Sequence, residues 1–196
     1  MEQPEYAVGV HPLDQTPPVI NQHRITSACF VPSPNCNTRP AGEISLLVIH
    51  NISLPPGQFG GGHVTELFTN CLDPQAHPFF AKLDGLEVSA HLLIERDGSM
   101  IQFVPFDRRA WHAGRSCFDG REACNDFSIG IELEGADDIP YTDAQYQVLA
   151  AVTRTLLVTY PNLTRDRITG HSNIAPGRKT DPGPAFDWAR YRQSLG

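Results

Sequence analysis

The feature that most limits the fold of this chain is an apolar run at residues 44–50, ISLLVIH. The run is short, rich in branched side chains and bounded by turn residues, which is typical of a β-strand covered on both faces. It ends on His50, and Asn51 follows directly. The sequence therefore predicts a central strand with two polar side chains at its end, where sites on such sheets gather.

Further patterns predict strands that extend this sheet. Residues 88–95 and 100–105 flank Asp97-Gly98, which is a strong signal for a two-residue hairpin turn. Residues 127–134, FSIGIELE, alternate between apolar side chains on one face and small or acidic side chains on the other. The apolar face of this predicted strand comprises Phe127, Ile129, Ile131 and Leu133.

The longest helix is expected over residues 142–160, where apolar side chains recur at helical spacing. Thr142 and Gln145 form a capping box at its start, and Pro161 stops it. The shorter elements that we expect are helices at 64–71 and 187–194, an edge strand at 28–31 and a loop at 108–114.

The order of these elements predicts one domain of the α/β class, with mixed α+β character and a central mixed sheet flanked by helices. We expect this single catalytic domain at residues 24–196. The segment before it, residues 1–23, is polar and proline-bearing and is expected to be a weakly ordered extension.

Charge, hydropathy and cysteine usage narrow the class of function. The formal net charge of −7 argues against a nucleic-acid-binding protein, which normally has a basic stripe, and against binding to an anionic membrane surface. No apolar window reaches the ~18 residues of a membrane span, and the first residues lack the basic start and apolar run of a secretory signal. Five cysteines without a CxxC pair favour free thiols in a reducing compartment. We therefore expect a cytoplasmic protein with no nucleic-acid or membrane partner. We also expect a monomer, although none of these features determines the oligomeric state.

A proline- and glycine-rich stretch at residues 168–188 carries the strongest chemical signal. It contains His171, Lys179 and Asp181, and the helix- and strand-breaking residues around them predict a rigid loop. Imidazole and carboxylate are both zinc ligands, and a catalytic zinc usually has three protein ligands and one open position. His50 can supply the third ligand if the fold brings the end of its strand to this loop.

A hydrolytic zinc site also needs an acid–base group and a charge that stabilises the reacting carbonyl. Zinc lowers the pKa of its bound water to near ~7, and Glu132 can take the water proton and return it to a leaving amine. Lys179 can stabilise the developing oxyanion. The alternative interpretation is that Glu132 and Glu134 lie on a solvated face of the sheet.

Two other positions allow two interpretations each. His91, in the predicted hairpin, is either a ligand or site-wall residue, or a histidine hydrogen-bonded within the sheet. Trp111 and His112 lie in the segment RRAWHAG. The tryptophan is either the wall of a cleft for a sugar or peptide, or a lid over the core.

Eight segments in order along residues 30–194 resemble the AmpD-type 1,6-anhydro-N-acetylmuramyl-L-alanine amidases, a branch of the zinc amidases related to peptidoglycan-recognition proteins. They read LLVIHNISLPPGQFG, LDPQAHP, VSAHLLIERDG, RAWHAG, CNDFSIGIELEG, YTDAQY, TGHSNIAP and RKTDPGPAFDW. A series of matches in the same order is far more specific than any one motif.

This resemblance implies a mixed sheet with helices and a zinc ion (Zn2+) held by His50, His171 and Asp181. It implies catalytic roles for Glu132 and Lys179. The implied reaction is hydrolysis of the amide between N-acetylmuramic acid and L-alanine, in cytoplasmic recycling of anhydro-muropeptides. The residues expected to border this anhydro-muropeptide substrate are Asn51, Trp111 and His112.

Three positions depart from the family pattern. Gly177 stands where a glutamate is common, and Glu87 and Ala123 stand where some relatives carry arginines that could bind substrate carboxylates. These departures bear on substrate affinity and preference, because the zinc and acid–base set is intact. Two other functions stay open: a related amidase that acts on intact cell wall outside the cytoplasm, and a peptidoglycan-binding module without catalysis.

Overall fold

A six-stranded mixed sheet forms the centre of the computed structural model, which describes residues 17–196. In the strand order β12-β5-β11-β6-β7-β3, the first four strands run parallel, β6 and β7 form an antiparallel hairpin, and β3 pairs parallel to β7. The described strands are β1 (Ile20–Asn21), β2 (Arg24–Ile25), β3 (Cys29–Phe30), β4 (Cys36–Thr38), β5 (Leu46–Ile52), β6 (Leu92–Ile94), β7 (Met100–Gln102), β8 (Arg108–Ala110), β9 (Cys117–Phe118), β10 (Arg121–Glu122), β11 (Ser128–Glu134) and β12 (Ile168–Gly170).

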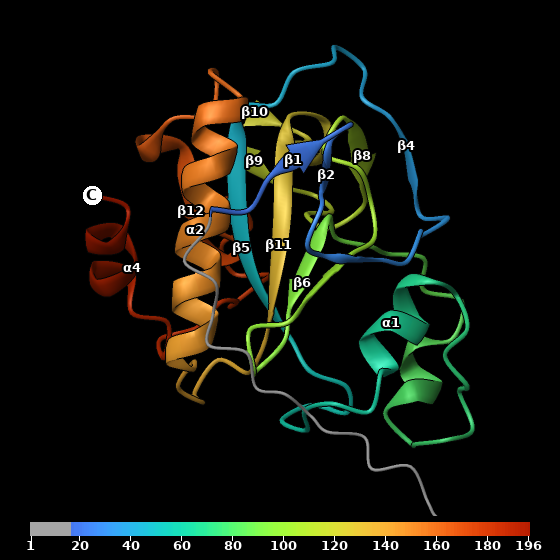
Figure 1. Ribbon diagram of the computed structural model, residues 1–196. Coiled ribbons are helices and arrows are strands. Elements are labelled where there is room, and N and C mark those ends of the chain that lie inside the picture. The colour runs from blue at the N-terminus through green and yellow to red at the C-terminus, as the bar shows by residue number, and fades with distance from the viewer. Residues whose placement is uncertain (1–16) are drawn as a thin grey trace, which may run out of the picture.

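Helices flank this sheet, as the sequence predicts. The α-helices are α1 (His63–Phe68), α2 (Asp143–Thr159), α3 (His171–Ile174) and α4 (Trp188–Ser194), and the 3-10 helices are η1 (Phe80–Leu83), η2 (Cys124–Asp126) and η3 (Arg165–Arg167). The long helix α2 lies along one face of the sheet, to the left of β5 and β11 in Figure 1, and α4 packs beside it. In the same view α1 stands away from α2, at the other side of the molecule.

The alternation of side chains along β5 divides them between two cores and fixes where its last residues point. Leu47 and Ile49 belong to the core under α2, whereas Leu46 and Val48 pack on the opposite face of the sheet with α3. By the same alternation, His50 projects from the face of Leu46 and Val48. The central strand predicted from the apolar run is therefore confirmed, and it turns its histidine away from α2.

The predicted capping box and hairpin are both present. The Thr142 hydroxyl oxygen accepts a hydrogen bond from the Gln145 N–H, and the Gln145 side-chain oxygen accepts one from the Thr142 N–H, each at 3.1 Å. Strands β6 and β7 flank the turn at Asp97-Gly98. Gly98 has φ 89°, a left-handed conformation that glycine adopts without strain.

Some segments expected to be loops contain regular structure. The stretch 168–188 begins as β12 and α3, and residues 108–110 form β8, which pairs with β4. These pieces are too short for a sequence period to reveal, and pairing with distant strands decides them. Phe127 also differs from expectation: it precedes β11 with φ −131° and ψ 6°, so it is not extended and packs with Leu46 and Val48 rather than under α2.

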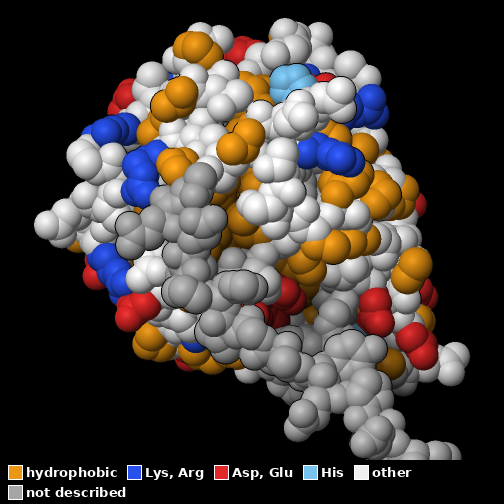
Figure 2. Space-filling view, in the orientation of Figure 1, with side chains coloured by type: hydrophobic (Ala, Val, Ile, Leu, Met, Phe, Trp, Pro, Cys, Tyr) orange, Lys and Arg blue, Asp and Glu red, His pale blue; other side chains and the backbone are white. Residues whose placement is uncertain are grey.

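Of the segment 1–23 expected to be weakly ordered, residues 1–16 lie outside the described part of the chain. Further along it, Ile20–Asn21 forms β1 and pairs with β2. Within residues 17–196, no helix has both the length and the apolar character that crossing a bilayer requires. On the face shown in Figure 2, basic side chains are interspersed with acidic and hydrophobic ones rather than gathered in a stripe.

Candidate functional site

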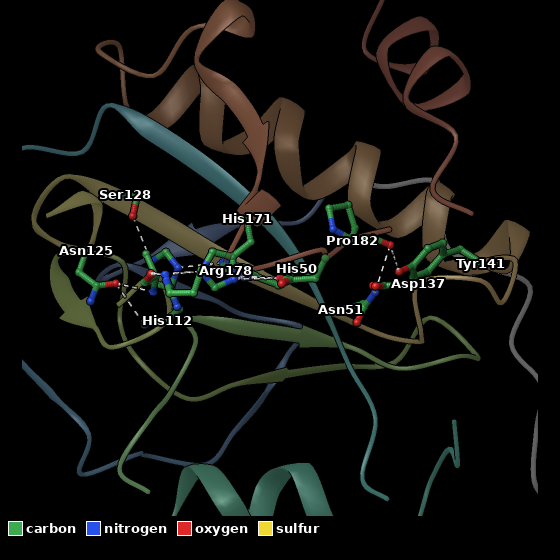
Figure 3. A network of polar contacts seen from close by, with 12 residues as sticks. His50, Asn51, His112, Asn125, Ser128, Asp137, Tyr141, His171, Arg178 and Pro182 are labelled. Carbon is green, nitrogen blue, oxygen red and sulfur yellow. Dashed lines mark hydrogen bonds and ion pairs between the residues drawn. The ribbon is translucent and has the colours of Figure 1, made fainter. Parts of the chain in front are cut away.

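Three ligand-type side chains meet at one end of the central strands. His50 Nδ1 lies 3.0 Å from His171 Nδ1 and 2.9 Å from Asp181 Oδ2, and His171 Nδ1 lies 3.0 Å from that same oxygen. Figure 3 shows the two imidazole rings turned toward one another. The exposed fractions of the three residues are only 1%, 3% and 9%, in that order. We call this arrangement the His–His–Asp triangle.

The sheet topology brings these three residues together. Strand β5 presents His50 near its C-terminal end, and its parallel neighbour β12 leads directly into α3. His171 is the first residue of α3, so it stands beside the end of β5. Asp181 comes from the loop after α3, and its carbonyl oxygen accepts a hydrogen bond from the N–H of Ser172. That bond returns the loop to the start of α3.

The far nitrogen atoms of both imidazoles decide what the triangle can bind. His171 Nε2 lies 3.1 Å from the carbonyl oxygen of Ala113, which can only accept, so a neutral His171 carries its proton there and directs a lone pair from Nδ1 into the triangle. His50 Nε2 lies 2.9 Å from His112 Nδ1. If His50 also carries its proton on Nε2, three acceptor atoms converge with no hydrogen between them. A cation satisfies such a set.

The chemistry of this donor set fits zinc. Two imidazole nitrogens and one carboxylate oxygen are ordinary zinc ligands, and both imidazoles have a partner for the other ring nitrogen, as metal-binding histidines usually do. Burial lowers the pKa of His50 to about 4. Burial opposes ionisation of Asp181, but in the tautomers whose Nδ1–H points at the carboxylate the hydrogen bonds from His171 and His50 outweigh burial, and the pKa of the carboxyl lies below its ordinary value. The neutral imidazole and ionised carboxylate are the forms that bind metal.

Glu132 lies beside the triangle in an environment that suits a general base. It is the register partner of His50, because β11 pairs in parallel with β5. Its Oε2 atom is buried and has no hydrogen-bond partner in the described part of the chain. Burial raises the pKa of Glu132 well above its ordinary value, with a further rise from the charge of Asp181 and an opposing effect from Lys179. Perturbed carboxyls of this kind are candidates for proton transfer.

The alternative interpretation of a solvated sheet face is wrong. Glu132 and Glu134 are 8% and 5% exposed, so both carboxylates are buried. They differ in their partners, however. The oxygens of Glu134 accept hydrogen bonds from the backbone N–H groups of Gly60 and Arg96. Glu134 is therefore satisfied within the fold, whereas one oxygen of Glu132 is not.

A single cavity of about 630 Å³ connects the triangle to the remaining candidates. Its volume lies within the range of ~300–1,000 Å³ that is common for small-molecule sites. Apolar side chains of α1 and its neighbourhood line part of it. All eight site residues predicted from the sequence line this cavity: His50, Asn51, Trp111, His112, Glu132, His171, Lys179 and Asp181.

Asn51 also supports the loop that carries Asp181. Its side-chain N–H₂ donates to Asp137 Oδ1 at 2.9 Å and to the carbonyl oxygen of Pro182 at 3.1 Å. The Tyr141 hydroxyl donates to the same carbonyl at 2.7 Å (Figure 3). The residue that follows Asp181 is thus held by two side chains from other elements.

The sequence did not reveal the side chains that hydrogen-bond to the backbone groups next to the proposed ligands. Arg178 donates to the Ala113 carbonyl at 2.7 Å, and this is the carbonyl that faces His171. Asn125 Oδ1 accepts hydrogen bonds from the backbone N–H groups of His112 at 3.1 Å and of Ala113 at 2.8 Å. No spacing or periodicity signals these contacts, because they join backbone groups to side chains from distant segments.

His91 is a hydrogen-bonded histidine within the sheet and does not line the cavity. Its Nδ1 accepts a hydrogen bond from the Gly130 N–H at 3.0 Å, and its Nε2 donates to the carbonyl oxygen of Arg108 at 3.0 Å. Both ring nitrogens are therefore used, and none is left for a metal. The interpretation of His91 as a ligand is wrong.

Comparison with known proteins identifies relatives along most of the chain. The family model described as N-acetylmuramoyl-L-alanine amidase matches residues 40–184. The chain is 67% identical over 169 residues to the 1,6-anhydro-N-acetylmuramyl-L-alanine amidase AmpD of Salmonella typhimurium strain SL1344, covering 86% of this chain and 90% of that protein.

Solved structures show the same similarity. A crystal structure of a selenomethionine AmpD derivative has a TM-score of 0.89 and 59% identity, covering 91% of this chain and 99% of that one. The Escherichia coli N-acetylmuramyl-L-alanine amidase AmiD, in complex with the substrate anhydro-N-acetylmuramic acid-L-Ala-D-gamma-Glu-L-Lys, has a TM-score of 0.57 and 28% identity, covering 84% of this chain and 60% of that one. The residues matched by the family model include every residue of the site described above.

Proposed function

Because this chain belongs to the N-acetylmuramoyl-L-alanine amidase family, we propose that it hydrolyses the amide bond between 1,6-anhydro-N-acetylmuramic acid and L-alanine in soluble muropeptides. The observation that carries the proposal is the His–His–Asp triangle in one cavity with Glu132, whose buried Oε2 atom has no hydrogen-bond partner within residues 17–196. The AmpD relative is named for this bond, and AmiD was solved with an anhydro-muropeptide substrate.

His50, His171 and Asp181 are the proposed ligands of a zinc ion. The convergence of two Nδ1 atoms and one carboxylate oxygen within 3.0 Å of each other supports this assignment. When bound, zinc supplies a water of lowered pKa and polarises the scissile carbonyl. The chain's part is to direct the lone pairs of both imidazoles to one point and to leave an open position toward the cavity.

Glu132 and Lys179 are the proposed catalytic side chains. Glu132 takes a proton from the attacking water as the C–O bond forms, and returns it to the nitrogen of L-alanine as the C–N bond breaks. Its raised pKa supports this role, because a carboxyl that binds a proton more readily than usual is a better base for water. Lys179 lines the same cavity, and its positive charge would stabilise the oxyanion that develops on the carbonyl.

Asn51, Trp111 and His112 are the proposed borders of the substrate. All three line the cavity, and Trp111 Nε1 donates to Asn37 Oδ1 at 3.2 Å, which orients its ring. Glu87 lines a smaller pocket that shares apolar residues with the main cavity. We infer that this chain lacks, at Glu87, the positive contact to substrate carboxylates that an arginine would give.

The proposed setting is cytoplasmic peptidoglycan recycling by a monomer. Cys29, Cys36, Cys71, Cys117 and Cys124 are all free thiols, which supports a reducing compartment. All proposed ligands and catalytic groups come from one chain, so a second copy has no residue to add to the set.

The direct test combines metal content with product analysis. Purified protein should carry about one zinc per chain and lose amide cleavage on chelation, with recovery when zinc is returned. Mass spectrometry of a soluble anhydro-muropeptide should show the free peptide and the sugar as the two products. Cleavage that persists unchanged in the zinc-free protein would refute the zinc mechanism.

A matched pair of variants on β11 isolates the proton-transfer group. Glu132→Gln should lower turnover by about 10²- to 10⁴-fold with zinc still bound, since it removes the acid–base group and no ligand. Glu134→Gln makes the same change two residues away, at a carboxylate that is satisfied by backbone N–H groups. It should keep most of the turnover. Equal effects of the two variants would argue against the assignment of Glu132.

The two competing functions give different outcomes in the same assays. An amidase for intact cell wall would release peptide from sacculi faster than from the soluble anhydro-muropeptide. A binding module would bind the muropeptide in zinc-replete buffer and yield no product. We expect neither result.

A further inference from the structure

The ring of His112 lies between a proposed metal ligand and a serine. Its Nδ1 is 2.9 Å from His50 Nε2, and its Nε2 is 3.0 Å from Ser128 Oγ (Figure 3). Neither contact reaches the triangle itself. Ser128, His112 and His50 form a hydrogen-bonded chain that ends at His50 Nε2, and the Nδ1 atom of the same ring faces His171 and Asp181.

The fold holds this ring firmly in place. Asn125 Oδ1 accepts the backbone N–H of His112, and Gly130 on β11 leaves room for the ring. A Cβ atom at Gly130 would lie 2.5 Å from His112 Cγ and Nδ1, closer than real Cβ contacts allow. The glycine in the strand therefore marks the close approach of this imidazole, and a ring so confined cannot swing away from His50.

The chain of hydrogen bonds has two possible settings, because a hydroxyl group and a neutral imidazole can each donate in either direction. In the first, His50 Nε2–H donates to His112 Nδ1, and His112 Nε2–H donates to Ser128 Oγ. His50 Nδ1 then turns a lone pair into the triangle. In the second, Ser128 O–H donates to His112 Nε2, and His112 Nδ1–H donates to His50 Nε2. His50 Nδ1 then carries a hydrogen toward Asp181. The two settings contain the same number of protons.

We propose that His112 is a positioning residue that, with Ser128, selects the tautomer of His50 and so makes the triangle ready for metal. This inference rests on the proposed zinc site and adds to it a role that the three ligands cannot fill alone. In the first setting, all three inward-facing atoms of the triangle are acceptors that a cation can bind. In the second setting, the hydrogen on His50 Nδ1 occupies the position of the cation. The same ring borders the cavity, so its removal affects both metal and substrate, and the test must separate them.

The test measures zinc affinity by competition with a chelator, without substrate. His112→Ala removes the acceptor of the His50 Nε2–H and should weaken zinc binding by about 10- to 100-fold, as is typical when a partner behind a ligand is lost. His112→Asn places an amide oxygen near the position of Nδ1 and should recover most of this loss. Ser128→Ala removes the partner of His112 Nε2 in both settings, so the ring loses its outer hydrogen bond, and zinc binding should weaken by at most about tenfold.

Trp111→Phe is the matched control, because it alters the adjacent side chain without a hydrogen bond to either imidazole ligand. Its zinc affinity should equal that of the wild type. Equal affinities of wild type and His112→Ala, or an Asn variant no better than the Ala variant, would overturn the inference. Failure of the wild type itself to bind zinc would instead refute the proposed metal site.

A second measurement uses the wild-type protein and does not depend on how any variant folds. Nitrogen-15 NMR of the imidazole rings reports which nitrogen carries the proton. With zinc added, His112 should be protonated on Nε2 and not on Nδ1. A proton on His112 Nδ1 in the zinc-loaded protein would overturn the inference, because His50 Nε2 could then only accept.

Discussion

Two buried histidine-bearing clusters share one side of the sheet, and they are built in opposite ways. In the first, which we call the Arg39 cluster, the guanidinium of Arg39 donates to the carbonyl oxygens of Phe106, Asn125, Asp126 and Ser128 and lies against His91. Both nitrogens of His91 have partners. In the second, the His–His–Asp triangle, acceptor atoms converge on one point with no donor of fixed identity.

The comparison shows that burial does not distinguish a structural histidine from a functional one. His91 and His50 are both almost fully buried, and burial lowers the pKa of each, to about 3 and about 4. The difference lies in whether the buried polar groups have hydrogen-bond partners. In the Arg39 cluster each donor is paired with an acceptor, whereas in the triangle acceptor atoms face one another. Polar groups that satisfy each other stabilise a fold, and those that do not are available to a ligand. The four predictions below test this division.

The largest effect is expected from Asp181→Asn. The change keeps the shape of the side chain but removes a charged ligand, so zinc should be lost and turnover should fall by at least about 10³-fold, or about 4 kcal/mol of transition-state stabilisation. The free energy of unfolding of the zinc-free protein should stay the same or rise, because the amide can donate into a set of acceptors. The measurements are metal analysis, turnover and urea unfolding. A variant with activity within tenfold of the wild type would contradict the assignment.

Arg39→Met should have the opposite pattern of effects: a loss of stability with zinc binding retained. It leaves the carbonyl oxygens of Phe106, Asn125 and Ser128 without a buried donor, so the free energy of unfolding should fall by about 3–5 kcal/mol. Zinc binding of the folded fraction should persist. Arg154→Met is the control, since that exposed guanidinium also donates to a carbonyl, of Ser194, and should change stability by no more than about 0.5 kcal/mol. If the free energy of unfolding fell equally in the two variants, the buried hydrogen bonds of Arg39 would contribute no more to stability than an exposed one.

The sequence revealed one of these clusters far better than the other. Strand β5, the hairpin and the cap of α2 follow from local patterns, and resemblance pointed to all three residues of the triangle. The Arg39 cluster gave no signal, because Arg39 sits in a segment of turn residues and its acceptors are backbone carbonyls from distant parts of the chain. Contacts of this kind depend on how segments pack, which no local period encodes.

A smaller effect is expected from the pH dependence of stability due to His91. Burial, together with the charge of Arg39, lowers its pKa from 6.5 to about 3, so the unfolded chain takes up a proton at a higher pH than the folded protein does. Stability from this residue is complete above pH 6.5 and declines as the pH falls toward 3. Between pH 6.5 and 5 the loss should be about 2 kcal/mol.

The contribution of His91 to the pH dependence is the difference between two slopes of the free energy of unfolding against pH. The free energy of unfolding of the zinc-free protein is followed from pH 6.5 to 5 for the wild type and for His91→Gln, which takes up no proton at this position. The wild-type curve should fall more steeply, whatever the absolute stability of the variant. Parallel curves would mean that the folded protein accepts the proton on His91 as readily as the unfolded chain.

The smallest expected effect tests whether the triangle depends on the network behind it. Tyr141→Phe removes the hydroxyl that donates to the Pro182 carbonyl, but Asn51 still donates to that oxygen, so the free energy of unfolding should fall by only about 1 kcal/mol. Tyr191→Phe, at a buried hydroxyl paired with Thr153, should cost a similar amount. Zinc affinity distinguishes them: it should drop severalfold in the first variant, whose lost bond braces the residue after Asp181, and stay unchanged in the second. Equal zinc affinities in the two variants would mean that the ligands alone fix the geometry of the triangle. The hydrogen bond from Tyr141 to Pro182 would then contribute to stability only, as the contacts of the Arg39 cluster do.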